Sequence, residues 1–356
     1  MPTSTTGTPA WTTSSTLDEI ASWLRGGRQI VVLTHQKPDG DAVGSTLGAV
    51  RALNAAAQMT VAQAWYTGPV PAWLPWLAGT TPFRVLNQEN GQAVPPPIEP
   101  DRVLITDTGS WSQLDLLREW LGPMRPHAAV IDHHVQGDGD VAPRRHIDTA
   151  ASAVCQPVAA LCVKLLGVRS AAELPQAVAT PLYLGLATDT GWFKHSNVTP
   201  DLLSLASELL RAGANSYELF QATEQRDKPG RIRLLAKALS SMELFESDQV
   251  AVMGLTRADF HAAGAEPQDT GGFVDTPATI ERVKVVCLLT EGEEQGQTVT
   301  KVSMRSKGGS GPTGVDVNEA ARKLGGGGHV RAAGARVRAS LAETKRRVLE
   351  ILKEQL

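Results

Sequence analysis

The sequence predicts an α/β protein with an N-terminal, doubly wound domain built on a mainly parallel sheet and a smaller C-terminal α/β domain. In the first half, apolar runs typical of buried strands alternate with helix-prone stretches, which is the pattern of a parallel sheet. Polar side chains gather directly after several of these runs. A polar stretch over residues 224–230 precedes a second, shorter α/β pattern, and 356 residues are enough for two cores.

The domain boundaries follow from composition. Residues 1–14 are rich in Ser, Thr, Gly and Pro, which predicts a flexible N-terminal arm. We expect the doubly wound domain over residues 15–212, a linker over 213–230 and the smaller domain over 231–356.

The elements of the first domain are predicted in chain order. Thr16 and Glu19 have the spacing of a capping box, which predicts a short helix that carries Ile20 and Leu24. Apolar runs predict strands over residues 29–33, 59–65, 102–106 and 127–131. Helix-prone stretches predict helices over residues 42–57, 111–121, 150–166, 174–187 and 199–212. The run QIVVL at 29–33 is continuous enough to be buried on both faces of a sheet.

The second domain shows a shorter pattern of the same kind. Strands are predicted near residues 249–255, 283–289 and 298–304, and a helix near 317–324. A glycine run follows at 325–328. The chain closes on a predicted amphipathic helix with Leu341, Val348 and Leu352 on one stripe.

Composition excludes several classes of protein. The chain is 42% hydrophobic and 20% charged, as in ordinary globular proteins, and its net charge of −3 gives no broad basic field for long nucleic acids. Three cysteines without a CxxC pair argue against a disulfide framework and predict buried thiols in a reducing compartment. No run reaches membrane-spanning length and no signal pattern opens the chain, so we expect a cytoplasmic protein without membrane contact.

The run Val130-Ile131-Asp132-His133-His134 is the centre of the functional prediction. Successive strand residues face opposite sides, so the three polar side chains cannot share one environment. The pattern is explained if this is the end of a strand at a functional site. One of the three side chains would then bind a metal, one would orient that ligand, and one would contact the substrate. A chance triplet on a surface loop is the alternative.

Three more polar clusters extend this prediction. His35, Asp39 and Asp41 follow the strand at 29–33, and Asp107 and Asp189 each begin an Asp-Thr-Gly turn. Three of the four clusters lie at predicted strand ends, where parallel sheets gather their ligands. Mixed nitrogen and oxygen donors favour Mn²⁺ or Mg²⁺ over thiolate-bound zinc. Ordinary polar turns, with Asp41 as a helix cap, remain the alternative.

Two His and four Asp are enough for two metal ions that share a carboxylate. Such a pair activates a bridging hydroxide and stabilises both the entering and leaving oxygens of a phosphoryl displacement. His134 could then protonate or hydrogen-bond a phosphate oxygen, and Asp132 could orient a ligand imidazole.

A second constellation lies near the C-terminus. The glycine run 325–328 with His329 exposes backbone N–H groups that can cradle an anion, although a flexible linker has the same composition. Arg305, at the end of a predicted strand, is a candidate phosphate clamp, with an exposed edge-strand arginine as the alternative.

In order and spacing, these motifs resemble those of the DHH phosphoesterase family, in the subgroup with a DHH-associated C-terminal domain. The resemblance covers nearly the whole chain after the arm. It rests on residues 34–45, on Asp107, on Asp132-His133-His134, on Asp189-Thr190-Gly191, and on residues 325–329 with Ala332-Ala333-Gly334. Residues 193–197 differ from the family pattern, which commonly has an Arg and an aromatic residue there.

The resemblance implies a role for each site residue. One metal would be bound by His35, Asp39 and Asp107, and the other by Asp41, Asp107, His133 and Asp189. Asp107 would bridge, His134 would contact the scissile phosphate, and Asp132 would support its neighbours. The nucleotide would be held across an interdomain cleft by Arg305, Ser306, Gly326, Gly327, Gly328 and His329.

Size and layout are most similar to the nanoRNase type of this family. This implies an enzyme with two divalent metals, Mn²⁺ or alternatively Mg²⁺. It would degrade very short single-stranded RNA to nucleoside monophosphates and dephosphorylate pAp to AMP. Short DNA is a further substrate class, and a homodimer is left open. The rival interpretations are a phosphodiesterase for linear or cyclic adenine dinucleotides (pApA, c-di-AMP) and a non-catalytic nucleotide-binding regulatory module.

Overall fold

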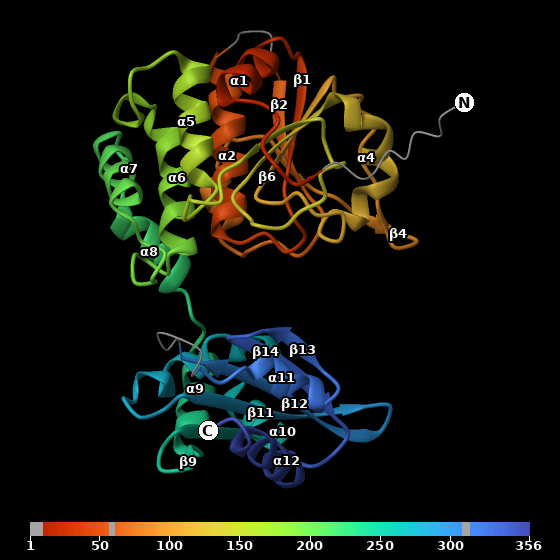
Figure 1. Cartoon of the computed structure of the whole chain (residues 1–356), viewed down its shortest axis with the longest axis vertical. Coiled ribbons are helices and arrows are strands. Elements are labelled where there is room, and N and C mark those ends of the chain that lie inside the picture. The colour runs from red at the N-terminus through yellow and green to blue at the C-terminus, as the bar shows by residue number, and fades with distance from the viewer. Residues whose placement is uncertain (1–9, 57–60, 308–313) are drawn as a thin grey trace. The chain divides into compact units, whose positions relative to one another are not determined.

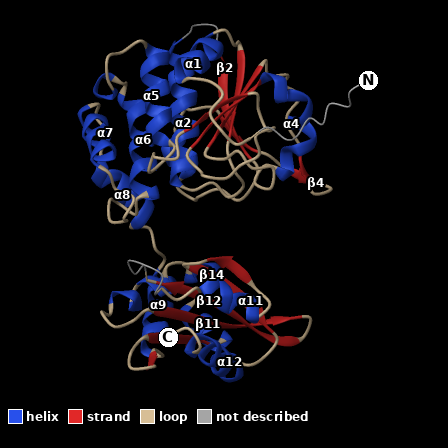
Figure 2. Cartoon of the chain, in the orientation of Figure 1, coloured by secondary structure: helices blue, strands red, loops and turns tan. Residues whose placement is uncertain are grey.

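The computed structural model describes residues 10–56, 61–307 and 314–356, and the chain divides into two compact units, residues 1–225 and 226–356 (Figure 1). Most of the predicted arm and the beginning of the strand predicted at 59–65 lie outside the described residues. Each unit has its own sheet, and the secondary structure of both is shown in Figure 2.

Within the described residues, the first unit is built on a six-stranded sheet with the order β3-β2-β1-β6-β7-β8. All of its neighbouring strands are parallel, as the alternating sequence pattern predicts. The strands are β1 (Gln29–Leu33), β2 (Val61–Tyr66), β3 (Phe83–Val85), β6 (Arg102–Thr106), β7 (Ala128–Asp132) and β8 (Arg144–Ile147).

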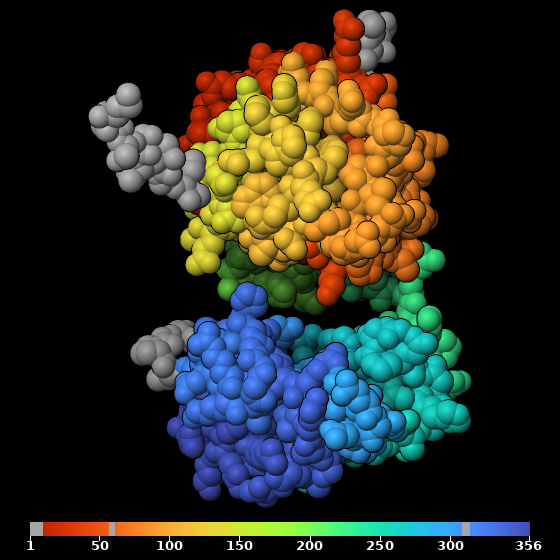
Figure 3. All heavy atoms as spheres, turned by 90° about the vertical axis from the view of Figure 1, so that its right-hand side faces the viewer, coloured from red at the N-terminus to blue at the C-terminus, as the bar shows by residue number. Residues whose placement is uncertain are grey.

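Alternate residues of the central strands enter two different cores. Ile30 and Val32 pack with helices on one face, while Val31 and Leu33 join a cluster with Leu121 on the other. The first face is covered by α1 (Leu17–Arg25), α2 (Gly40–Ala56), α5 (Cys155–Leu166) and α6 (Gln176–Asp189). The second face is covered by the short helix α4 (Arg118–Met124), and Figure 3 shows this side of the unit. Burial of both faces explains why these strands are apolar throughout.

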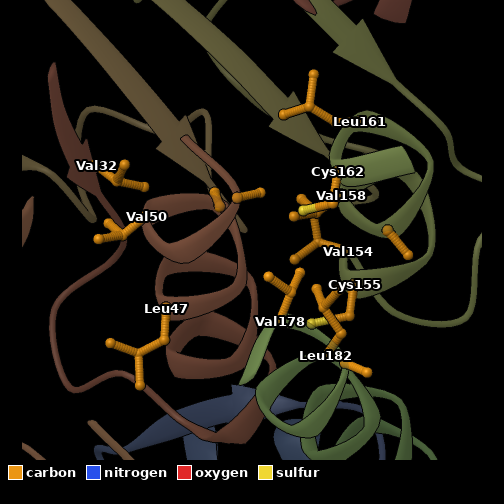
Figure 4. Close-up of a cluster of buried hydrophobic side chains, with 14 of the residues drawn as sticks. Val32, Leu47, Val50, Val154, Cys155, Val158, Leu161, Cys162, Val178 and Leu182 are labelled. Atoms are coloured by element: carbon orange, nitrogen blue, oxygen red, sulfur yellow. The ribbon is translucent and has the colours of Figure 1, made fainter. Parts of the chain in front are cut away.

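Helices α2 and α6 approach each other closely through a stripe of glycines. Gly40, Gly44 and Gly48 recur at a spacing of four, so they share one face of α2. A Cβ atom at Gly44 would lie only 2.4 Å from the carbonyl oxygen of Pro181 in α6. Figure 4 shows the apolar side chains that α2, α5 and α6 contribute around this contact. The stripe therefore fixes the beginning of α2 against the end of α6.

Several elements differ from the sequence prediction. The helix predicted at 111–121 is a 3₁₀ turn over Asp115–Leu117 followed by α4, and β3 and β8 are additional strands. A small hairpin, β4 (Gln88–Glu89) and β5 (Gln92–Ala93), was not predicted either. After α7 (Pro200–Arg211), part of the predicted linker 213–230 forms a further helix, α8 (Ser216–Glu224). Residues 12–14 of the predicted arm are hydrogen-bonded to β8 and the residues just before it.

The second unit has a six-stranded mixed sheet with the order β13-β14-β12-β11-β10-β9. Its strands are β9 (Glu243–Phe245), β10 (Val250–Leu255), β11 (Val285–Glu294), β12 (Gln297–Ser306), β13 (Gly327–His329) and β14 (Ala332–Val337). One face packs with α9 (Pro229–Ser240) and α10 (Arg257–Ala263), and the other with α11 (Val317–Lys323) and α12 (Leu341–Lys353). Only β10 and β11 are paired in parallel within this sheet of the described chain.

The predicted fold class is confirmed: a parallel six-stranded domain precedes a separate, smaller α/β domain. The three cysteines are buried free thiols, as predicted. The prediction of a cleft between the domains stays a prediction. Among the described residues, no helix is both long and apolar enough to span a bilayer.

Candidate metal centre

The predicted site residues of the first unit meet at one edge of its sheet. Strands β1, β6 and β7 are adjacent and parallel, so their carboxyl ends lie together. His35 follows β1, Asp107 follows β6, and Asp132 is the last residue of β7. Asp189 is not on the sheet. It ends α6, and the glycine stripe of α2 holds that helix in place.

Asp107 lies between two histidines. Its Oδ2 atom is 3.3 Å from Nε2 of His35, and its Oδ1 atom is 3.5 Å from Nε2 of His133. Around His35, the carboxylate of Asp39 comes within 4.0 Å of Nε2. His35, Asp39 and Asp107 together form one group of donor atoms close enough for a single ion.

A second donor group surrounds His133. Its Nε2 atom is 4.0 Å from Asp41 Oδ2 and 3.9 Å from Asp189 Oδ2, as well as 3.5 Å from Asp107. Asp41, His133 and Asp189 form another group with the spacing of a metal site. These two groups match the ligand sets implied by the resemblance, except that the second lacks Asp107. A third group, Asp107, His133 and His134, overlaps both of them. Asp107 contacts His35 of the first group and His133 of the second.

Backbone carbonyls orient both imidazoles. Nδ1 of His35 lies 2.8 Å from the carbonyl oxygen of Gln36, and Nδ1 of His133 lies 3.1 Å from that of Ala151. An N–H at Nδ1 that donates to a carbonyl leaves Nε2 as the free ligand atom of a neutral imidazole. Both Nε2 atoms face the aspartates, which is the orientation that a metal site requires.

Asp41 is fully buried and is held by the beginning of α5. The backbone N–H of Val154 donates to its Oδ2 atom at 2.6 Å, and that of Cys155 donates to Oδ1 at 3.0 Å. Space for the carboxylate depends on Gly185 in α6, where a Cβ atom would lie 2.6 Å from Asp41 Oδ1. The helix terminus thus supports the negative charge.

The electrostatics are those of a site built for positive charge. Burial, reinforced by the charges of Asp107 and Asp189, raises the pKa of Asp41 well above its usual value. Burial also raises the pKa of Asp189 to about 6. Converging carboxylates disfavour one another's ionised forms, and a bound cation would relieve this repulsion.

At the histidines, the neighbouring carboxylates favour the protonated, charged form of the imidazole. Burial alone would lower the pKa of His35, but its hydrogen bond and attraction to Asp107 outweigh burial and raise it to about 9. Burial likewise opposes the shift at His133, where Asp107 and Asp41 raise the pKa to about 10. The same two hydrogen bonds hold the pKa of Asp107 below its ordinary value despite burial. Without a metal, protons on the two imidazoles supply the positive charge.

The backbone of Asp107 is strained. Its φ is +63°, a left-handed conformation that non-glycine residues rarely adopt. Such conformations persist where the surrounding structure requires them and are concentrated at functional sites. Here the conformation places the carboxylate between His35 and His133.

His134 pairs with Asp132, and its Nδ1 atom also lies 3.9 Å from Oδ1 of Asp107 in the third donor group. Asp132 is fully buried, and its Oδ1 atom lies 2.7 Å from Nδ1 of His134 and accepts the backbone N–H groups of His133 and His134. The hydrogen bond to Asp132 raises the pKa of His134, whose side chain is 54% exposed. The buried Asp132 therefore orients the imidazole of His134, while the exposed part of the ring remains accessible to solvent and ligands.

The second unit contains a groove of about 730 Å³ beside the glycine run. Arg305, Gly326 and Gly327 line this groove, with Arg336 from β14. The hydroxyl of the buried Ser306 donates to the carbonyl of Val330, while Gly328 and His329 belong to β13. Ser306, Gly328 and His329 are not among the groove residues.

The glycine run is shaped by strand packing. A Cβ atom at Gly326 would lie 2.1 Å from the carbonyl oxygen of Gly334, and one at Gly328 would lie 2.5 Å from that of Ala332. Both glycines therefore allow the close approach of β14, which the sequence pattern did not reveal. At Gly327 a Cβ atom would meet Oδ1 of Asn318 at an ordinary contact distance of 3.8 Å, so this glycine is not required by packing.

Two family profiles match the chain. One described as "DHH family, N-terminal domain" matches residues 29–186, and one described as "DHHA1 domain" matches residues 247–356. The chain is also 33% identical over 350 residues to a Thermus thermophilus protein named bifunctional oligoribonuclease and PAP phosphatase NrnA, covering 97% of this chain and 95% of that one. The chain belongs to the DHH phosphoesterase family. It is therefore an enzyme of that family, as the motifs predicted.

Further relatives agree with this membership. A Mycoplasma pneumoniae protein with the same name is 24% identical over 343 residues, covering 94% of both chains. A solved structure of an exopolyphosphatase-related protein from Bacteroides fragilis has a TM-score of 0.79 at 23% identity and covers 95% of both chains. That likeness shows a shared fold.

Some residues that shape this DHH site were missed by sequence reasoning. Gly185 gives Asp41 its space, Asn197 donates from Nδ2 to the carbonyl of Asp189 at 3.3 Å, and Trp11 contacts the loop of His134. The glycine spacing of α2 was a readable signal of close helix packing. Trp11 is far along the chain from His134, so only the folded structure could identify it. Asn197 lies only eight residues after Asp189, but no local pattern indicated this contact.

Proposed function

We propose that this DHH enzyme is a metal-dependent phosphohydrolase that degrades very short RNA to nucleoside monophosphates and dephosphorylates pAp to AMP. The observation that carries the proposal is the position of Asp107, which contacts the histidine of each of the two donor groups. The names of the Thermus and Mycoplasma relatives support the choice of RNA and pAp.

Two divalent ions suit the donor atoms, with His35, Asp39 and Asp107 for one and Asp41, Asp107, His133 and Asp189 for the other. Carboxylate and imidazole donors without a thiolate favour Mn²⁺, with Mg²⁺ as the alternative. When bound, such ions would supply an activated water and stabilise the charge of the displaced oxygen. The raised pKa values of the fully buried Asp41 and the half-buried Asp189, both repelled by Asp107, support this assignment.

The chain's own groups then act on the phosphate. His134 would donate a hydrogen bond or proton from Nε2 to a phosphate oxygen, because Asp132 occupies its Nδ1 atom. Asp132 would hold the imidazole at the correct angle without touching substrate. These roles explain why His134 is accessible while Asp132 is fully buried.

Substrate recognition is assigned to the C-terminal unit. Residues 15–212 would form the catalytic domain and 231–356 the substrate-binding domain. Arg305, which lines the groove, would clamp a phosphate with its planar fork, and Gly327, which has no side chain, would allow close approach to its backbone. Ser306, Gly328 and His329 are next to or near groove residues in the chain and would add further contacts to the nucleotide. A net charge of −3 favours oligonucleotides of a few residues over long chains. The names of the relatives favour RNA, with short DNA as a second substrate class.

The deciding experiment is a time course with Mn²⁺ on 5′-labelled di-, tri- and pentanucleotide RNA, with pAp in parallel and EDTA as the control. The proposal expects release of nucleoside monophosphates and AMP, and no release with EDTA. Turnover of pApA or cyclic di-AMP without cleavage of RNA would replace the proposal with the dinucleotide interpretation. Metal-dependent nucleotide binding without any product would support a regulatory module.

A further inference from the structure

The segment before α1 covers the outer edge of the sheet in the first unit. The backbone N–H groups of Ser14 and Ser15 both donate to the carbonyl of Arg145 in β8, at 2.8 and 3.0 Å. The hydroxyl of Thr13 donates to the carbonyl of Ile147 at 3.0 Å and accepts its N–H at 2.9 Å. These bonds satisfy the unpaired groups of an edge strand and anchor the segment along β8.

The anchored segment brings Trp11 to the metal centre. Its indole N–H donates to the backbone carbonyl of His134 at 3.0 Å. The ring lies on two glycines: a Cβ atom would come within 1.7 Å of the ring at Gly109 and within 2.5 Å at Gly137. Gly109 is two residues after Asp107, and Gly137 is three residues after His134. One indole therefore contacts both of the loops that carry these residues.

The two loops beneath Trp11 are also joined to each other. The backbone N–H of Asp138 donates to the carbonyl of Gly109 at 2.7 Å, and the carboxylate of Asp138 accepts the N–H of Trp111 at 2.7 Å. The loops after β6 and β7 thus form one hydrogen-bonded layer, and the indole packs on its surface.

We propose that Trp11 is a positioning residue for His134, an inference that rests on the proposed function of His134. The imidazole of His134 is held at Nδ1 by Asp132, and its main chain is held at the carbonyl by Trp11. Without the second contact, the loop can shift and carry the ring away from the phosphate. Misplacement by about 1 Å can cost as much as about 100-fold in rate.

Kinetics of Trp11→Ala and Trp11→Phe test the proposal. Trp11→Ala is expected to lower kcat on pAp about 10- to 100-fold with little change in KM, because the ligand sets and the groove are untouched. Trp11→Phe keeps the ring packing but loses the N–H, so an intermediate kcat is expected. The matched control is Trp76→Ala in α3 (Leu74–Ala78), a tryptophan that is 42% exposed, and it should keep wild-type kinetics.

A double-mutant cycle separates positioning from a general loss of stability. Gly137 does not have a left-handed φ, so the backbone tolerates alanine, but the new Cβ atom must displace the indole. Gly137→Ala alone should reproduce the fall in kcat. In the Trp11→Ala background it should have no further effect, because the space is already free. Additive losses would overturn the proposal.

Hydrogen exchange provides a readout that does not depend on turnover. The amide of Asp138 should exchange faster in Trp11→Ala than in the wild type, and at the wild-type rate in Trp76→Ala. Wild-type kcat together with unchanged exchange in Trp11→Ala would overturn the proposal. If Trp11→Ala does not fold, Trp11→Phe and Gly137→Ala carry the same test. If the wild type hydrolyses neither substrate, the proposed function fails, and exchange alone decides whether Trp11 holds the loop.

Discussion

Nε2 of His35 lies 3.3 Å from Oδ2 of Asp107, and this contact joins the polar cluster after β1 to the Asp-Thr-Gly turn after β6. The pair is mostly buried, so its charges are poorly screened by water. In the absence of a metal, a proton on His35 balances the carboxylate. The same arrangement recurs on the other side of Asp107, where His133 lies at 3.5 Å. In the proposed metal centre, metal ions and protons would therefore compete for the same Nε2 atoms.

Metal binding should release protons at neutral pH. The pKa values of His35 and His133 are raised to about 9 and about 10, so both imidazoles are protonated at pH 7 in the metal-free protein. A metal binds only the neutral imidazole, so each proton must leave, and affinity should rise with pH up to these values. Titration calorimetry in buffers of different ionisation enthalpy should detect release of at least the two imidazole protons per protein. Binding without proton release at pH 7 would contradict the assignment of both histidines.

Asp107→Asn tests the bridging role. The amide keeps the size of the side chain but lacks the charge that both donor groups need, so the fold should be kept and metal stoichiometry should fall. Removing a residue that only hydrogen-bonds a metal ligand typically lowers activity about 10- to 100-fold. Removing the bridging ligand itself should therefore lower activity by more. Asp201→Asn, a change at an exposed position in α7, is the control. Substantial Mn²⁺-dependent activity in Asp107→Asn would exclude a bridging carboxylate.

The motif-bearing part of the fold was predictable because its signals are local. Strands β1 and β6 occupy residues 29–33 and 102–106 as predicted, since continuous apolar runs are typical of a parallel sheet covered on both faces. The polar clusters follow these runs directly. The rule that parallel strands gather ligands at their carboxyl ends was then enough to bring His35 and Asp107 together.

The unpredicted parts depend on contacts between distant residues. Strand β8 has the sequence Arg144-Arg145-His146-Ile147 and lies at the edge of the sheet. Because an edge strand can be polar, β8 lacks the apolar run by which strands such as β1 and β6 were predicted. Helix α8 lies in a stretch whose polarity indicated a linker. Trp11 is far along the chain from His134, and no periodicity connects them. Composition indicated a mobile arm, whereas its residues 12–14 are fixed by pairing with β8 and the residues before it.

Asp132→Asn should reduce activity and change its pH dependence. The hydrogen bond and charge of Asp132 raise the pKa of His134, so a neutral amide should let that pKa fall. If protonated His134 acts on the phosphate, the alkaline limb of the kcat profile should move to lower pH. The loss at the optimum should be about 10- to 100-fold. Asp140→Asn, which alters another loop carboxylate that accepts from Trp111 Nε1, should leave the profile unchanged. An unshifted alkaline limb in Asp132→Asn would assign that limb to another group.

Two alanine substitutions in α2 should differ in stability. At Gly44 the new Cβ atom meets the backbone carbonyl of Pro181 at 2.4 Å, which cannot move without shifting α6. Overpacking of this kind costs about 1–3 kcal/mol in the free energy of unfolding. At Gly48 the new Cβ atom meets only the flexible side chain of Leu182, at 2.8 Å. The better helix propensity of alanine, about 1 kcal/mol, offsets part of the cost of this contact in the free energy of unfolding. Urea denaturation of the metal-free proteins should therefore place Gly44→Ala clearly below Gly48→Ala, and equal midpoints would contradict the close packing of α2 on α6.

Within its own unit Arg305 forms an ion pair that a bound phosphate would have to replace. This allows the role of Arg305 to be distinguished from that of a general surface charge. Its Nε atom lies 3.6 Å from Oδ1 of Asp275, so a substrate phosphate must displace or share that partner. Arg305→Ala should raise KM for pAp about 10- to 100-fold, as expected for a lost charge-assisted hydrogen bond of about 1.5–3 kcal/mol. Asp275→Asn should instead lower KM, because it frees the guanidinium.

The control for this pair is Arg336→Ala. Arg336 lines the same groove but forms an ion pair with Glu294, and its loss removes the same charge from the same surface. A phosphate clamp requires that KM responds to Arg305 and Asp275 in opposite directions while responding weakly to Arg336. If Arg336→Ala raises KM as much as Arg305→Ala does, the groove attracts substrate by its charge alone, and the planar fork of Arg305 has no special part in recognition.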